Sequence, residues 1–130
     1  MELKNRSQYL DKLISVQDME VIKVVTGIRR CGKSSLLKLM MAHLREQGVM
    51  EEQILSMNFE SMQFADMDSK SLYQYVMERA PKEKRLYLFL DEVQKVRDWQ
   101  DAVNSFRVDL DCDITVTGTN DDLPSSELST

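Results

Sequence analysis

The chain has 130 residues, 42% of them hydrophobic and 30% charged, which is enough to form the core of one domain and excludes disorder of the whole chain. The net charge of −5 argues against a broadly basic nucleic-acid binder but leaves room for one local anion site. No apolar run approaches the roughly 18 residues of a membrane span. Residues 1–6 are polar and lack the apolar stretch expected of a secretory signal, and the 2 cysteines give no disulfide framework or zinc spacing. We therefore expect a soluble, cytoplasmic protein with no membrane partner and no clear nucleic-acid site.

The predicted elements alternate between helix and strand along the chain. Apolar residues at three- and four-residue spacing predict the helices, and β-branched or apolar runs predict the strands. The run 86–90 is apolar without alternation, as expected of a strand covered on both faces. This order predicts an α/β fold with a parallel sheet and helices on both faces. The expected elements are a helix at 7–16, strand 21–26, helix 34–47, strand 54–59, helix 69–79, strand 86–90, a helix capped by Asp98, and strand 114–117.

Residues 27–34 match the pattern G-x-x-x-x-G-K-[ST] at every fixed position, between a predicted strand and a predicted helix. The glycines let backbone N–H groups face phosphate oxygens, Lys33 would neutralise the β- and γ-phosphates, and the Ser34 hydroxyl would ligate Mg²⁺. A chance glycine turn is the alternative, and the flanking strand and helix disfavour it. The predicted nucleotide-binding residues are Gly27, Ile28, Arg29, Arg30, Cys31, Gly32, Lys33, Ser34 and Ser35.

Two carboxylates, Asp91 and Glu92, end the apolar strand at the edge where parallel sheets bind ligands. We expect Asp91 to hold the metal shell and Glu92 to orient and deprotonate the water that attacks the γ-phosphate. An acidic turn after an apolar strand is common by itself. The predicted phosphate loop upstream is what favours a role for this pair in metal binding and catalysis.

A polar cluster at 115–120 ends the last predicted strand. Asn120 could offer its amide to the γ-phosphate or to the attacking water, or it could belong to an ordinary turn. Asn58 or Glu60 could hydrogen-bond Glu92 and keep it from the water, although solvated strand ends explain them equally well. Trp99 shares a helix face with other apolar residues and is expected in the core.

Together these motifs resemble the AAA-type P-loop ATPases. More narrowly, the chain resembles a bacterial and archaeal family of predicted AAA ATPases with G-(I/V)-R-R-x-G-K-(S/T), D-E-(I/V)-Q, a nearby tryptophan and T-G-S-N. The corresponding residues here are 27–34, 91–94, Trp99 and 117–120, with Thr119 in place of the usual serine. The resemblance implies a three-layer P-loop NTPase core. It also implies that 21–130 form an ATPase core truncated before its fifth strand, and residues 1–20, which contain the helix predicted at 7–16, form a helical segment before it.

The resemblance also implies binding of ATP or ADP with Mg²⁺. We therefore expect an ATPase, with Lys33, Glu92 and Asn120 as catalytic residues and Ser34 and Asp91 as metal ligands. Full activity is expected to require a further C-terminal part. The alternative is a nucleotide-dependent switch without significant turnover. A protein partner, the oligomeric state and the source of any arginine finger stay open.

Overall fold

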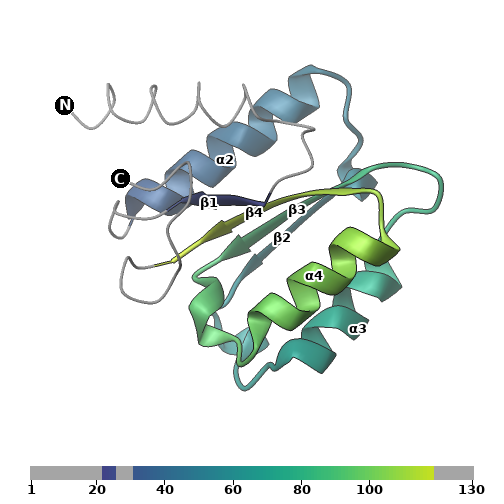
Figure 1. Cartoon of the computed structure of the whole chain (residues 1–130). Coiled ribbons are helices and arrows are strands. Elements are labelled where there is room, and N and C mark those ends of the chain that lie inside the picture. Colours follow the sequence, from purple (N-terminus) through teal and green to yellow (C-terminus); the bar gives the residue numbers. More distant parts are fainter. Residues whose placement is uncertain (1–21, 26–30, 119–130) are drawn as a thin grey trace.

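The computed structural model describes residues 22–25 and 31–118, in which four strands form one parallel sheet in the order β1-β4-β3-β2 (Figure 1). The predicted α/β fold with a parallel sheet is therefore confirmed. The predicted helix at 7–16 lies outside the described residues. The strands are β1 (Lys23–Val25), β2 (Ile54–Asn58), β3 (Leu86–Asp91) and β4 (Cys112–Thr117), and the helices are α2 (Cys31–Glu46), α3 (Ser69–Arg79) and α4 (Trp99–Asp109).

Three layers result, because α2 covers one face of the sheet and α3 and α4 cover the other (Figure 1). Every residue of β3 is buried, as its uninterrupted apolar run predicts. Leu88 and Leu90 pack toward α3 and α4, whereas Tyr87 and Phe89 pack toward α2. Trp99 is 7% exposed and lies in the core, as predicted.

The ends of two helices show which capping signals are effective. Asp68 precedes α3, and its Oδ1 accepts a hydrogen bond from the Ser71 backbone N–H at 3.0 Å, which lowers the pKa of Asp68. Asp98 occupies the equivalent position before α4, but its side chain makes no capping hydrogen bond and its backbone is left-handed, with φ 59°. The predicted capping role of the Asp98 side chain is therefore wrong, because this backbone does not adopt the extended geometry that aims a carboxylate at the first turn.

Two elements begin earlier than predicted. Helix α2 begins at Cys31 instead of Ser34, because the glycine and polar residues of its first turn carry no apolar periodicity. Strand β4 begins at Cys112 instead of Ile114, because Asp113 interrupts the apolar run that defines a buried strand.

A buried ion pair explains Asp113. Its carboxylate accepts from the ammonium group of Lys23 on β1, and the two side chains are 3% and 0% exposed. Both side chains lie on the sheet face that α2 covers. The pair links β1 to β4, and in this pairing of strands Lys23 lies opposite Thr115, two residues after Asp113.

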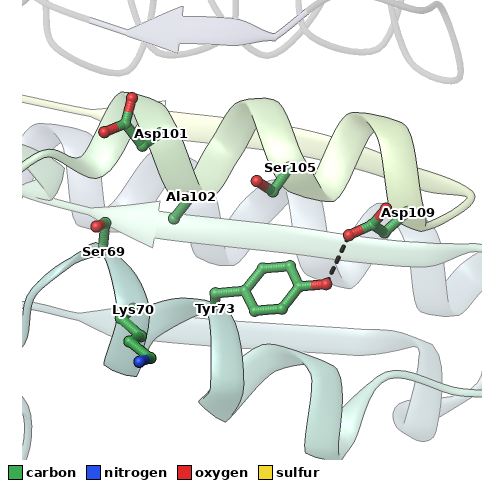
Figure 2. A pocket seen from close by; sticks show the side chains of 7 residues that line it. All are labelled: Ser69, Lys70, Tyr73, Asp101, Ala102, Ser105 and Asp109. Atoms are coloured by element: carbon green, nitrogen blue, oxygen red, sulfur yellow. Dashed lines mark hydrogen bonds between the residues drawn. The ribbon is translucent and has the colours of Figure 1, made fainter.

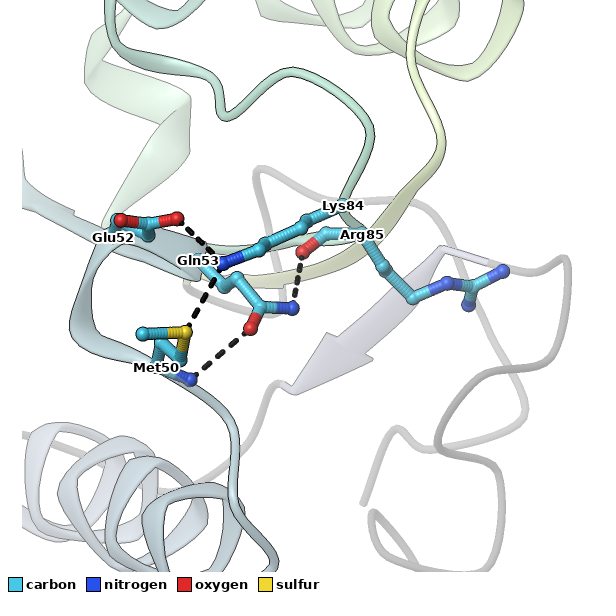
Figure 3. A network of polar contacts seen from close by, with 5 residues as sticks. All are labelled: Met50, Glu52, Gln53, Lys84 and Arg85. Atoms are coloured by element: carbon cyan, nitrogen blue, oxygen red, sulfur yellow. Dashed lines mark hydrogen bonds and ion pairs between the residues drawn. The ribbon is translucent and has the colours of Figure 1, made fainter.

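A second polar network fixes the start of β2 (Figure 3). Gln53 donates through Nε2 to the Arg85 carbonyl at 3.0 Å and accepts through Oε1 from the Met50 backbone N–H at 3.1 Å. Lys84, in the turn before β3, pairs with Glu52 at 2.9 Å. In the described part of the chain, no helix has the length and apolar character needed to cross a membrane.

Candidate functional site

The carboxyl ends of all four strands meet at one edge of the sheet, because the strands are parallel. The register places Asn58 of β2 opposite Asp91 of β3, and Val25 of β1 opposite Thr117 of β4. Strand β4 lies between β1 and β3, so its last residue lies between the strand that leads to the predicted phosphate loop and the strand that ends in the carboxylates.

Asp91 is held rigidly at this edge. It is 5% exposed, and its Oδ1 accepts a hydrogen bond from the Thr117 hydroxyl at 2.5 Å. Its backbone carbonyl accepts from the Phe59 N–H at 3.0 Å, which extends the pairing with β2 beyond the strand. A carboxylate fixed in this way keeps one orientation when a cation approaches.

Glu92 leaves the strand through a left-handed backbone conformation, with φ 59° and ψ 50°. A residue other than glycine in this region costs of order 1 kcal/mol and persists only where neighbours enforce it. Here the Glu92 backbone N–H donates to the Thr117 hydroxyl oxygen at 2.9 Å. The turn is thus secured from the adjacent strand and places the half-buried Glu92 directly after Asp91 at the carboxyl edge of the sheet.

Gln94 contacts the Glu92 carboxylate. Its Nε2 donates to Glu92 Oε1 at 2.8 Å, while its own Oε1 is buried without a partner. Asn58 uses its Oδ1 to accept from the Glu60 backbone N–H, and neither Asn58 nor Glu60 hydrogen-bonds Glu92. The contact that sequence analysis offered to Asn58 or Glu60 is therefore made by Gln94.

Part of the predicted phosphate loop is described. Residues 26–30 lie outside the described residues, as does Asn120, and nothing is described of the side chains of 31–34. The backbone of 31–34 forms the first turn of α2, and Ser35 follows half-buried. No acidic side chain lies in this first turn, so none competes for its N–H groups or its positive dipole end. Leu36, Met40 and Leu44 anchor the helix against β3.

The donor set at this edge fits a hard cation bound together with phosphate. Among the described residues there is no group of three His, Cys, Asp or Glu side chains that could hold a metal alone. Mg²⁺ in nucleotide sites does not need such a group, since it is held by one or two protein oxygens, waters and the phosphates. Asp91 is predicted to provide one such oxygen group and Ser34 another.

Sequence analysis placed Thr117 in the polar cluster and in the T-G-S-N match but gave it no role at the site. The available signal was a pair of hydroxyl residues, Thr115 and Thr117, that alternate with apolar residues in the last strand. Thr117 is 0% exposed, although its hydroxyl contacts both Asp91 and Glu92.

A separate shallow hollow of about 260 Å³ lies between α3 and α4 (Figure 2). The Tyr73 hydroxyl donates to Asp109 Oδ2 at 2.5 Å, and this hydrogen bond raises the pKa of Tyr73. The Tyr73 ring also stacks on Phe106. The hollow contains none of the predicted site residues. Its lining residues are Ser69, Lys70, Tyr73, Asp101, Ala102, Ser105 and Asp109.

Comparison with known proteins identifies the family of the chain. A family model described as AAA domain matches residues 20–130. The chain belongs to the AAA domain family. It is also 41% identical over 128 residues to an uncharacterized protein of Haemophilus influenzae (strain ATCC 51907 / DSM 11121 / KW20 / Rd), an alignment that covers 97% of this chain and 32% of that protein. The chain thus spans about a third of the length of this curated relative. No solved structure matches the chain significantly.

Membership of the AAA domain family confirms the resemblance drawn from the motifs and indicates a nucleotide-binding, ATPase-like function. The β1-β4-β3-β2 sheet of this AAA domain brings Asp91 and Glu92 together with the end of β4. It also places the start of α2 after β1.

Proposed function

We propose that this AAA domain binds ATP with Mg²⁺ and, in the intact protein, hydrolyses it to ADP and phosphate. The observation that carries the proposal is the joint fixing of Asp91 and Glu92 by Thr117 at the carboxyl edge of the sheet. A metal-holding carboxylate beside a second carboxylate that can act as a base is the arrangement that hydrolysis requires.

The phosphates would be bound at the start of α2. Backbone N–H groups of residues 27–35 would surround the β- and γ-phosphates, and Lys33 would neutralise them. Ser34 and Asp91 would hold Mg²⁺, which when bound withdraws charge from the phosphate oxygens. The absence of acidic side chains in the first turn of α2 supports an anion site there.

Glu92 would orient a water molecule and accept its proton as the water oxygen bonds to the γ-phosphorus. The bond between the γ-phosphorus and the bridging oxygen breaks, and that oxygen leaves with ADP. Asn120 would donate its amide to the γ-phosphate. Adenine specificity is proposed on the family resemblance alone.

The proposal extends to the organisation of the protein. Residues 21–130 would form the ATPase core after a helical segment at 1–20, and full activity would require a C-terminal part beyond residue 130. A protein partner and an oligomer are compatible with this organisation.

Phosphate release by the intact polypeptide that carries this sequence tests the proposal. We expect Glu92→Gln, which keeps the shape of the side chain but removes the base, to lower kcat by roughly 10²–10⁴-fold while ATP still binds. Lys33→Ala should weaken ATP binding itself.

The same assay separates the alternative function. If wild type and Glu92→Gln both bind ATP and neither releases phosphate, the domain is a nucleotide-dependent switch without turnover. Failure to bind ATP with Mg²⁺ would overturn both functions.

A further inference from the structure

We propose that the Thr117 hydroxyl is a positioning group that sets the metal-holding carboxylate and the catalytic base by one pair of hydrogen bonds. This inference rests on the proposed ATPase function and assigns the residue that organises its site. Thr117 is fully buried, donates to Asp91 Oδ1 at 2.5 Å and accepts from the Glu92 backbone N–H at 2.9 Å.

The two bonds have different effects. A hydroxyl has one proton to donate, and giving it to the Asp91 carboxylate fixes the rotation of both groups. The oxygen then accepts from Glu92 and secures the left-handed turn, with φ 59°, at which the Glu92 side chain leaves the strand. One hydroxyl therefore contacts the Asp91 carboxylate directly and fixes the backbone turn from which the Glu92 side chain leaves.

The position of Thr117 in the sheet extends this control toward the phosphate loop. Thr117 lies opposite Val25, the last residue of β1, and the next backbone N–H, that of Gly118, donates to the Val25 carbonyl at 3.3 Å. The end of β4 is thus bonded through its backbone to the strand before the phosphate loop and through its Thr117 side chain to the carboxylates. A shift of β4 relative to β1 would be transmitted to Asp91 and Glu92.

Thr115 provides a matched comparison within the same strand. It lies two residues earlier on the same face and is 1% exposed, yet its hydroxyl oxygen is buried without a hydrogen-bond partner. The two threonines therefore share residue type, strand and burial, and they differ in whether the hydroxyl contacts the site.

The test compares Thr117→Val, Thr117→Ser and Thr115→Val in the intact polypeptide, with far-UV circular dichroism to verify folding. Misplacing catalytic groups by about 1 Å can cost a hundredfold in rate. We expect Thr117→Val to lower kcat by roughly ten- to a hundredfold and to change KM by less than about threefold. Thr117→Ser should retain most of the wild-type kcat because it keeps the hydroxyl. Thr115→Val should have the kcat of the wild type. If Thr117→Val does not fold, Thr117→Ala replaces it in the comparison.

A binding measurement keeps the inference testable without turnover. Because Thr117 also orients Asp91, Thr117→Val should need roughly tenfold more Mg²⁺ than Thr117→Ser for the same ATP affinity. Equal kcat and equal Mg²⁺ requirement in the valine and serine variants would overturn the inference while leaving the proposed function intact. A wild type that binds ATP with Mg²⁺ but releases no phosphate would overturn hydrolysis, and the Mg²⁺ comparison would then decide the role of Thr117. A wild type that does not bind ATP with Mg²⁺ would overturn both.

Discussion

Removing one member of the buried ion pair between Lys23 and Asp113 should destabilise the domain severely. Replacing Asp113 by alanine leaves the Lys23 ammonium in a site where its side chain is 0% exposed and water cannot screen it. An uncompensated buried charge of this kind costs about 3–5 kcal/mol. Domains of this size are stable by about 5–15 kcal/mol, so the loss is a large fraction of the total free energy of unfolding.

Thermal and urea unfolding of the purified chain measure this loss. For a chain of 130 residues the expected change corresponds to a fall in Tm of roughly 10–20 °C. The double variant Lys23→Met, Asp113→Leu removes both charges and fills the site with apolar groups. It should recover most of the loss, because a buried ion pair is often worth no more than the apolar residues that replace it.

The exposed pair between Arg45 and Glu51 is the control. Its side chains are 47% and 72% exposed, so Glu51→Ala should cost less than about 1 kcal/mol. If Asp113→Ala costs no more than Glu51→Ala, burial does not determine the energy of the Lys23–Asp113 pair and the reasoning is wrong. If the double variant is as unstable as Asp113→Ala, the loss comes from packing and not from the unpaired charge.

Three further predictions follow from single contacts. Gln94→Met, which removes the hydrogen-bond donor to the Glu92 carboxylate, should lower kcat by about tenfold without changing ATP affinity. A higher kcat would instead show that the Gln94 contact holds Glu92 away from the attacking water. The hydrogen bond from the Ser71 N–H lowers the pKa of Asp68 below its ordinary 3.8. The wild type should therefore be more stable than Asp68→Ala by a constant amount well above pH 3.8, and this advantage should vanish as the pH falls through the lowered pKa. Urea unfolding as a function of pH measures the advantage, and its persistence below that range would contradict the prediction. Burial raises the pKa of the Cys112 thiol to about 11. Alkylation of this residue near pH 8 should therefore be roughly a hundredfold slower in the folded chain than in the urea-unfolded chain. Mass spectrometry measures both rates, and equal rates would refute the prediction.

The local pattern of the sequence determined most of the secondary structure. The uninterrupted apolar run of β3 predicted burial on both faces, and helix α3 was predicted with the bounds that it has, because its apolar spacing is a local signal. The order of strands and helices also predicted the parallel sheet. The motif Asp91-Glu92 could be located because it directly follows a strand.

Only the tertiary structure decided how distant polar residues pair. In the sequence, Asp113 interrupts the apolar pattern of β4. The structure explains it, because its carboxylate pairs with Lys23, 90 positions earlier. Asp98 reads as a helix cap, and the left-handed backbone that prevents this follows from the turn that joins η3 (Val93–Lys95) to α4. The T-G-S-N match includes Thr117 and not Thr115, but it did not predict that the Thr117 hydroxyl contacts the two carboxylates. What distinguishes Thr117 is its place at the end of a strand that lies between β1 and β3, where its hydroxyl can reach both Asp91 and Glu92.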